Sequence, residues 1–279
     1  MFKIKFADVL IVTVLALLIC SGSALSQTAS VTITPASVDT RVKPGASYTK
    51  NFTLVNNSDE RLRFRASAED VWIDENNARQ EGRPGTLPRS ASLWIQFTPN
   101  EVVIEPHGTA VIKALITVPQ GLAGSFYTVP VFDVAPVKTS VITNAALTNV
   151  ATASIGVRFR TLMMLTTETG AEYNVELTGA KVTPPTASSE LELNLDLHNR
   201  GNAHAKMRGA FAILDSAGQL AGRGTIDEKR ILPTQQKALK GKWAGELKPG
   251  DYTCVITLSY NRIGMEPASL VKEVSFKVK

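Results

Sequence analysis

The sequence predicts an all-β protein made of two tandem immunoglobulin-like antiparallel β-sandwich domains behind a cleaved N-terminal signal peptide. Apolar residues alternate with polar ones over 52–56, 61–68 and 191–197, which is the pattern of strands that bury one face and expose the other. Turn-forming sequences such as Lys43-Pro44-Gly45 and Lys248-Pro249-Gly250 separate the alternating segments. No convincing amphipathic helix follows the signal peptide. Short strands with frequent turns are typical of antiparallel sandwiches.

The first 26 residues have the organisation of a secretory signal peptide. Lys3 and Lys5 form a basic head, residues 9–20 are almost entirely apolar, and small residues follow. The sequence Ala-Leu-Ser at 24–26 favours cleavage before Gln27. The apolar run is shorter than the roughly 20 residues that span a bilayer, although an uncleaved anchor is the alternative. We therefore expect a periplasmic or extracellular, cell-surface protein that meets the membrane only through this peptide.

Composition limits the partners and the way the fold is held together. The chain has 279 residues, with 30 basic and 25 acidic side chains. Loss of residues 1–26 removes two lysines and Asp8, so the net charge falls from +5 to +4, which favours a solvated surface or an anionic envelope polymer over nucleic acid. Cys254 is then the only cysteine, so we expect a buried thiol and no disulfide. The length suits two domains, which we place at 27–168 and 169–279.

The two predicted domains repeat one plan. In the first, a strand ends at Asn56 and a turn follows at Pro106, while Asn199 and Pro233 take the same places in the second. The step from Asn to Pro is 50 residues in the first domain and 34 in the second. We assign the additional residues to the polar stretch 74–92, because insertions accumulate in surface loops.

Residues 155–165 are predicted to form the long last strand of the first domain, after a polar loop over 138–149. Period-two alternation gives this strand two different faces. Arg158 and Arg160 share one face, and the other face carries Ile155, Val157 and Phe159. We expect the arginines to lie near the cleft between the domains, where cations attract a carboxylate or an acidic polymer.

A second basic row lies on the strand predicted over 61–68. Its outward residues are Arg61, Arg63 and Arg65. We interpret them as a solvated outer face that also discourages edge-to-edge aggregation. Trp72 and Trp94, further along the chain, are expected in the core of the first domain.

No motif points to an enzyme, a cofactor or a metal. The sequence has no glycine-rich phosphate loop, no nucleophile elbow and no zinc-protease motif. His198 and His204 flank a turn and can approach each other, but a metal site needs further ligands and only Asp196 is near. We therefore expect neither catalysis nor a bound cofactor, although an active site assembled from distant residues would leave no such motif.

Four segments, taken in order, resemble the periplasmic chaperones of pilus assembly. They are Val38-Asp39-Thr40-Arg41-Val42, Pro44-Gly45, Asn56-Asn57 and Val71-Trp72-Ile73-Asp74, and the strand over 155–165 takes the place of the family's last first-domain strand. The resemblance implies capture of a pilus subunit by β-strand addition, in which backbone hydrogen bonds give affinity and alternate side chains fill grooves. It also implies that Arg41 and either Arg158 or Arg160 hold the subunit's C-terminal carboxylate. The donated apolar row would be Ile155, Val157 and Phe159.

This resemblance covers mainly residues 31–166, and the chain departs from the family at two places. Phe97-Thr98-Pro99-Asn100 stands where the family has a Pro-Pro pair, and Leu165-Thr166-Thr167 replaces its aromatic-Arg-Pro exit. The two-domain layout is also similar to the WxL-interacting surface proteins, which bind wall polymer through one domain and a partner through the other. Those proteins carry a C-terminal membrane anchor, whereas here a predicted strand runs to Lys279.

Two functions stand as hypotheses. The first is a non-enzymatic, exported, chaperone-like protein that captures a surface or pilus subunit by strand addition and is monomeric when empty. The alternative is a cell-surface or wall-associated structural or adhesion module that binds an envelope polymer. The first predicts a complex with one protein client, and the second predicts sedimentation with the envelope that salt reverses.

Overall fold

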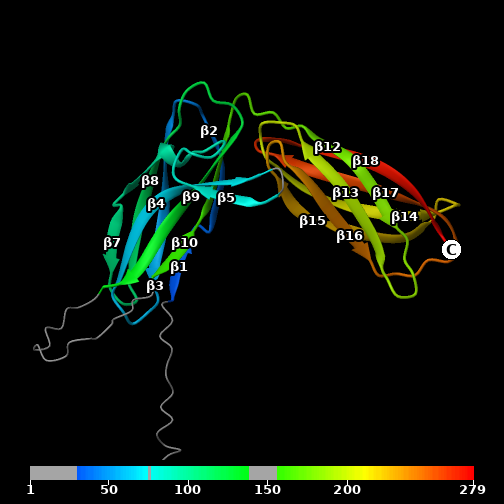
Figure 1. The fold of residues 1–279 in the computed structure, drawn as a ribbon, viewed down its shortest axis with the longest axis horizontal. Helices are drawn as coiled ribbons and strands as arrows, with labels where there is room; N and C mark the ends of the chain where they lie inside the picture. The colour runs from blue at the N-terminus through cyan, green and yellow to red at the C-terminus, as the bar shows by residue number, and fades with distance from the viewer. Residues whose placement is uncertain (1–29, 75–76, 138–155) are drawn as a thin grey trace, which may run out of the picture.

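The computed structural model describes residues 30–74, 77–137 and 156–279 (Figure 1). It consists almost entirely of strands, with one short 3-10 helix, η1 (Ser92–Trp94). The predicted all-β class, with sheets that form sandwich domains, is confirmed.

Three expectations from the sequence fall outside these residues: the signal peptide over 1–26, the loop over 138–149 and the position of Ile155. Within the described ranges, no helix has both the length and the apolar character needed to cross a membrane.

Two sheets face each other in the first half of the chain. The four-stranded sheet has the order β1 (Val31–Thr34), β3 (Ser47–Asn56), β8 (Thr109–Thr117) and β6 (Ile95–Thr98). The larger sheet has the order β2 (Ser37–Val42), β11 (Leu162–Thr167), β9 (Ser125–Pro136), β4 (Leu62–Ile73) and β5 (Arg79–Gly82). Beside this path, β10 (Val157–Arg160) pairs with β9, and β7 (Glu101–Ile104) pairs with β4.

The first core lies between these two sheets and is built from the alternating residues. Phe52 and Leu54 of β3 and Phe64 of β4 are fully buried, while Arg63 beside Phe64 is exposed. Phe132 of β9 is also fully buried, with its ring centroid 5.2 Å from that of Phe52. The apolar face of each strand therefore faces the opposite sheet, as period-two alternation requires.

β10 and β11 belong to one continuous strand. Their pairing with β9 keeps a single register on both sides of Thr161. Thr161 lies opposite Pro130, whose ring nitrogen cannot donate a hydrogen bond, but the Thr161 N–H still donates to the Pro130 carbonyl at 3.0 Å. In the described part of the chain, the predicted last strand of the first half therefore runs from Val157 to Thr167.

One ladder of the larger sheet is parallel. β2 runs beside β11, with Ser37 opposite Leu162 and Val42 opposite Thr167, whereas the other ladders between named strands are antiparallel. The preceding strand, β1, pairs with β3 in the other sheet. β2 therefore reaches this edge only from Ser37 onward, and it covers β11 but not β10.

The second half is one seven-stranded antiparallel sheet. Its order is β12 (Val175–Thr183), β13 (Leu191–Asn199), β16 (Gln236–Trp243), β15 (Leu220–Ile231), β14 (Ala205–Asp215), β17 (Gly250–Arg262) and β18 (Met265–Val278). The two terminal strands, β12 and β18, contact each other, so the sheet folds over a second core. Cys254 is buried in this core as expected, and burial raises the pKa of its thiol to about 11.

A buried asparagine takes the same role in each half. The Asn56 side chain donates to the Ile104 carbonyl at 3.2 Å, and the Asn199 side chain donates to the Ile231 carbonyl at 3.1 Å. Each side-chain oxygen accepts a hydrogen bond from the backbone N–H two residues further on, at 3.0 Å in both cases. Asn56 thereby joins the end of β3 to the end of β7, and Asn199 joins the end of β13 to the end of β15.

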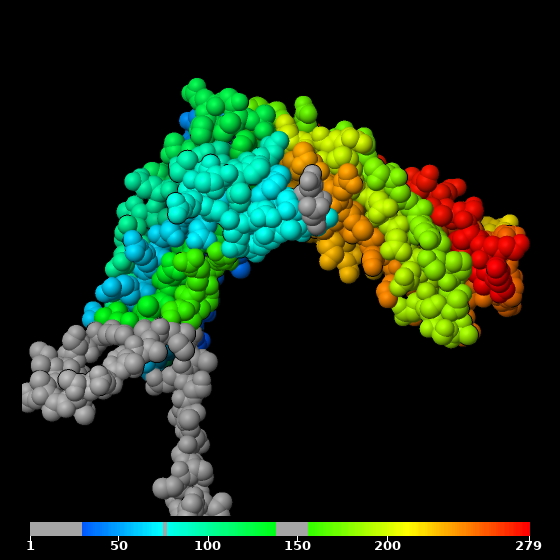
Figure 2. All heavy atoms as spheres, in the orientation of Figure 1, coloured from blue at the N-terminus to red at the C-terminus, as the bar shows by residue number. Residues whose placement is uncertain are grey.

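The two halves meet at an angle, so the molecule is arched (Figures 1 and 2). Hydrogen bonds cross the junction at two separate places. The Ser125 N–H donates to the Asn202 carbonyl at 2.9 Å, and the Gln235 side-chain amide donates to the Asn77 side-chain oxygen at 2.8 Å. The β4–β5 hairpin thus reaches across to the second half.

Candidate functional site

β10 is an edge strand in the described part of the chain. The Thr161 N–H points to β9, and backbone direction alternates along a strand, so Val157 and Phe159 also direct their backbone groups to β9. Arg158 and Arg160 consequently direct their N–H and C=O groups away from the sheet. Along β11 this same side pairs with β2, but no described strand covers it along β10. These backbone groups are available to another strand.

The apolar face of β10 points toward the first core. Phe159 is half-buried and packs against that core, while Val157 keeps 37 % of its surface exposed. Ile155, predicted for the same row, lies outside the described residues. Val157 is therefore the more open of the two described members of this row.

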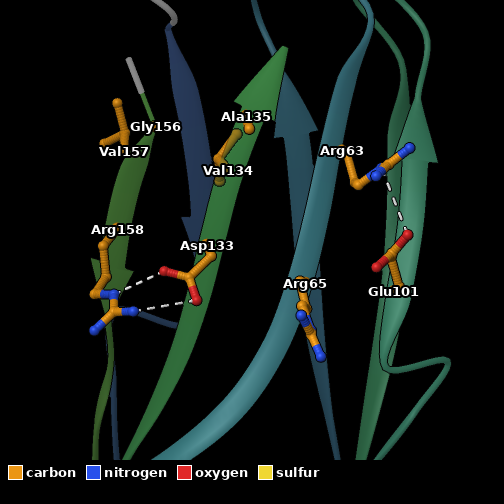
Figure 3. Close-up of a pocket in the computed structure, with 9 residues that line it drawn as sticks. All are labelled: Arg63, Arg65, Glu101, Asp133, Val134, Ala135, Gly156, Val157 and Arg158. Carbon is orange, nitrogen blue, oxygen red and sulfur yellow. Dashed lines mark hydrogen bonds and ion pairs between the residues drawn. The ribbon is translucent and has the colours of Figure 1, made fainter. Parts of the chain in front are cut away.

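Arg158 and Arg160 already have carboxylate partners in their own sheet. The Arg158 side chain lies 2.7 Å from the Asp133 carboxylate (Figure 3). It also lies 3.1 Å from the Glu69 carboxylate. Arg160 lies 2.6 Å from Glu69 and also pairs with Glu81. Hydrogen bonds to Asp133 and Glu81 raise the pKa of the two guanidinium groups. The carboxylate of a partner would therefore have to displace these acids.

Opposite charges alternate across the outer face of the sheet. Arg158 of β10, Asp133 of β9, Arg65 of β4 and Glu101 of β7 lie opposite one another in register (Figure 3). Arg63 pairs with Glu101 at 3.5 Å. Opposite charges on neighbouring strands favour the sheet. The arginines of β4 and its edge, Arg61, Arg63 and Arg65, thus lie on a solvated face where neighbouring carboxylates balance their positive charge.

Arg41 does not lie beside the arginines of β10. It is opposite Thr166, which is eight residues from Arg158 along the same strand, or about 26 Å at the usual rise per residue. Its guanidinium group lies against Gly264 and donates to the Glu168 carbonyl at 3.4 Å. Arg160 is six residues from Thr166, or about 20 Å along the strand. One carboxylate therefore cannot contact Arg41 together with either Arg158 or Arg160, so the structure does not bring together the pair that the resemblance implied.

The two halves enclose a cleft with a cavity of about 380 Å³. Its apolar lining includes Trp72, Val129, Leu162, Met164 and Leu232. Its charged lining consists of Arg79, Arg160, Arg230 and Lys237, and none of its described lining residues is acidic. Positive charge and apolar surface thus line the same cavity. Of the arginines predicted to bind a partner, only Arg160 lines it.

The two tryptophans of the first half have different positions. Trp94 packs against the first core, as predicted, with its ring centroid 4.8 Å from that of Phe126. The expectation for Trp72 is wrong, because Trp72 lines the cleft, with its ring 5.7 Å from that of Tyr127. Its side of β4 faces the second half of the chain, and the alternation within one strand cannot reveal that neighbour.

A second polar cluster joins the two halves. His204 Nδ1 lies 3.0 Å from Ser125 Oγ, and His204 Nε2 lies 3.3 Å from a carboxylate oxygen of Asp39. Lys206 Nζ lies 2.8 Å from the same carboxylate. The order Ser, His, Asp is that of a hydrolase triad, but Ser125 is fully buried and its Oγ also accepts the His204 backbone N–H at 3.0 Å. No substrate reaches this serine, so we assign the cluster to the junction.

The arrangement of the histidines does not support metal binding in the described part of the chain. Among the residues that the structure describes, no group of three or more His, Cys, Asp and Glu side chains is placed to hold a metal ion. His204 belongs to the junction cluster, and His107 pairs with Asp59 at 2.9 Å on the surface.

The junction cluster predicts a loss of stability at acid pH. Burial alone would raise the pKa of Asp39, but hydrogen bonds and charge from His204 and Lys206 outweigh it and lower the pKa to about 2. Because the pKa is lower in the folded state than the ordinary value of 3.8, the contribution is complete above pH 4 and is lost as the pH falls toward 2. A shift of this size corresponds to about 2 kcal/mol.

Urea unfolding at pH 5 and pH 2.5 measures this contribution. The wild type is expected to lose about 1.5 kcal/mol more free energy of unfolding over this range than Asp39→Asn, which cannot titrate at this position. Equal losses in the two proteins would show that the Asp39 carboxylate is not stabilised by the junction.

No protein-family model matches the chain, and no curated protein matches it. Among solved structures, the chain is similar to the class 5 fimbriae chaperone CfaA, with 15% identity, coverage of 90% of this chain and 100% of that chain, and a TM-score of 0.47. It is also similar to a chain of the complex between the SafA pilin and the SafB chaperone of Salmonella enterica, with 10% identity, coverage of 88% and 98%, and a TM-score of 0.42. The CupB2 chaperone of Pseudomonas aeruginosa is similar with 9% identity, coverage of 85% of this chain and 97% of that chain, and a TM-score of 0.41. Pilus-assembly chaperones are thus among the solved structures to which this chain is similar, at identities of 9–15%.

Proposed function

We propose that this protein is an exported, non-enzymatic binding protein that captures a surface or pilus subunit by adding a strand of that client to the free edge of β10. The backbone direction of β10 carries the proposal. Arg158 and Arg160 direct their N–H and C=O groups away from β9, on a side that no described strand covers. A client strand placed there continues the sheet at the point where β2 stops.

The client contacts differ between the two faces of β10. Val157, the exposed member of the apolar row, meets an apolar side chain of the client, and Phe159 and Ile155 extend this row. Arg158 and Arg160 hold β10 against β9 and β4 through their ion pairs, while their backbone groups meet the client. Arg41 contacts a different part of the client, since it lies about 26 Å along the strand from Arg158.

The proposed place of action is the periplasm or the cell surface. The basic head and apolar run within residues 1–26 support export. The client class follows from the segments around Arg41 and Trp72 that resemble pilus-assembly chaperones. We expect the protein to be monomeric until the client binds.

Proline at position 158 tests strand addition directly. Arg158→Pro removes a backbone N–H that points away from β9, so the ladder with β9 keeps its hydrogen bonds, while an added strand loses one and meets the proline ring. Arg158→Ala is the matched control, because it removes the same ion pairs but keeps the N–H group. In cells that make the C-terminally tagged protein, we expect Arg158→Ala to keep its stoichiometric client, and Arg158→Pro to recover roughly tenfold less.

The same purification separates strand addition from the alternative. Equal recovery of the client with both variants, at unchanged thermal stability, would mean that the client does not pair with β10. Sedimentation with envelope material that salt reverses, with no stoichiometric protein, would instead favour the polymer-binding module. The ion pairs on the outer face of the sheet do not favour that second function, since they leave little uncompensated positive charge there.

A further inference from the structure

One face of the second-half sheet is uncovered in the described part of the chain. It is the outward face of four neighbouring strands, β15, β14, β17 and β18, and it begins beyond Lys206, which pairs with Asp39 of the first half. The inward residues of these strands, such as Phe211 and Ile256, are buried in the second core. The outward residues of the four strands, up to Leu214 of β14, form what we call the outer face, and it lies far from β10 (Figure 1).

The centre of the outer face is uncharged and mostly apolar. Ala212 of β14 lies opposite Val255 of β17, and Ala210 lies opposite Thr257. Val271 of β18 lies opposite Thr257 on the other side and is 64 % exposed. The face therefore has a column of small side chains on β14 beside a column of larger, β-branched side chains on β17. Exposed apolar patches of this kind mark contact surfaces.

Opposite charges lie on the two sides of this centre. Arg223 of β15 is in register with Ala212, and Glu273 of β18 is in register with Val255. The two charged residues are thus three strand spacings apart, or about 14 Å. Both are exposed, and neither has an ion-pair partner among the described residues. Arg223 and Glu273 therefore do not neutralise each other within one copy of the chain.

A second copy of the chain would complement this arrangement. When two outer faces pack with a two-fold axis parallel to the strands, between β14 and β17, β15 of each copy lies over β18 of the other. Arg223 of each copy then meets Glu273 of the other. Ala212 of each copy likewise lies over Val255 of the other, so small side chains receive larger ones. The outer face is therefore complementary to itself in both charge and shape.

We propose that two copies of this protein associate weakly through the outer face, with Arg223 of each copy opposite Glu273 of the other. The four strands are about 19 Å across and Arg208–Leu214 is about 23 Å long, so the contact buries roughly 900 Å² in total. Stable complexes bury roughly 1,200–2,000 Å². The dilute protein is therefore monomeric, and pairs form at high concentration. The contact leaves β10 free in both copies, so it does not rest on the proposed function.

Charge reversal tests the contact in the purified protein. Sedimentation velocity measured up to about 1 mM protein follows the association. Arg223→Glu and Glu273→Arg each create two like-charge contacts in the pair, so each is expected to weaken self-association roughly tenfold or more. Lys113→Glu is the control, because it makes the same charge change as Arg223→Glu at an exposed position of β8, and it is expected to leave self-association unchanged.

A mixture of the two variants restores the complementary charges. In a pair formed from Arg223→Glu and Glu273→Arg, the two substituted positions meet each other with opposite charges, and so do the two unchanged positions. We expect this mixture to associate at least as tightly as the wild type, although each variant alone associates weakly. A mixture of Lys113→Glu with Glu273→Arg has the same net charges but keeps one like-charge contact, so it is expected to associate less tightly.

Three results would overturn the proposal. They are a wild type that stays monomeric at about 1 mM, single reversals that associate as the wild type does, and a mixture of the two variants that does not recover association. Arg158→Pro, which tests strand addition, is expected to self-associate normally. Loss of self-association in Arg158→Pro would place the contact at the edge of β10 and would also contradict the outer face. Failure of strand addition and failure of this contact therefore give different results.

Discussion

Replacing Phe132 with alanine is expected to lower the free energy of unfolding by about 3–5 kcal/mol. Phe132 is fully buried in β9, and its ring centroid lies 5.2 Å from that of Phe52 and 6.2 Å from that of Phe97. These two rings come from β3 and β6 of the opposite sheet. Loss of the Phe132 ring leaves a cavity between the sheets that neighbouring side chains cannot fill without moving the backbone.

Urea unfolding followed by tryptophan fluorescence measures this loss. Leu93→Ala is the matched control, because Leu93 is 74 % exposed and its truncation is expected to cost less than about 0.5 kcal/mol. A cost for Phe132→Ala no larger than that for Leu93→Ala would contradict the packing of the two sheets. Phe132 also lies opposite Phe159 of β10 in register, so the same variant is expected to loosen the edge strand.

The sequence predicted the strands and their faces because both depend on local alternation. Leu191, Leu193, Leu195 and Leu197 are all buried, as their spacing indicated, and Arg63 and Arg65 are exposed. The direction of a side chain relative to its own strand follows from a period of two. Neighbouring residues in the chain are sufficient for this prediction.

Pairing between strands could not be predicted in the same way. The ion partners of Arg158 are Asp133 and Glu69, which lie 25 and 89 residues away in the chain. Alternation placed Arg158 on a polar face, but it gave no information about which strands lie beside it. For the same reason, the parallel pairing of β2 with β11, which separates Arg41 from Arg158, left no signal in the sequence.

The cleft was missed because its parts come from both halves of the chain. Trp72 was expected in the core of the first domain, and it instead faces the second half. Arg230 and Lys237 lie on separate strands, β15 and β16, and become neighbours only through the fold. The signal in the sequence was limited to the pattern Asp227-Glu228-Lys229-Arg230, in which nothing distinguishes Arg230 from a solvated residue.

Alanine at either buried asparagine is expected to lower the free energy of unfolding by about 3 kcal/mol. The Asn56 amide group donates to the carbonyls of Glu60 at 2.7 Å, Ile104 at 3.2 Å and Glu105 at 3.1 Å. The Asn199 amide group donates to the carbonyls of Ala203 at 2.8 Å and Ile231 at 3.1 Å. Truncation leaves these carbonyls without the asparagine donor in places that water reaches poorly, because both asparagines are 0 % exposed.

Aspartate at these positions separates the hydrogen bonds from simple loss of volume. Asn199→Asp keeps the oxygen that accepts from the Gly201 N–H, but it places a second oxygen against two carbonyls, so its cost is expected to exceed that of Asn199→Ala. Asn57→Ala, at an exposed neighbouring position, is the control and is expected to cost little. Calorimetric unfolding compares these variants, and hydrogen exchange shows which half loosens. If each amide joins strand ends within its own half, Asn56→Ala is expected to loosen only the first half and Asn199→Ala only the second. An unchanged free energy of unfolding for Asn199→Asp would mean that the Asn199 amide does not donate to those carbonyls.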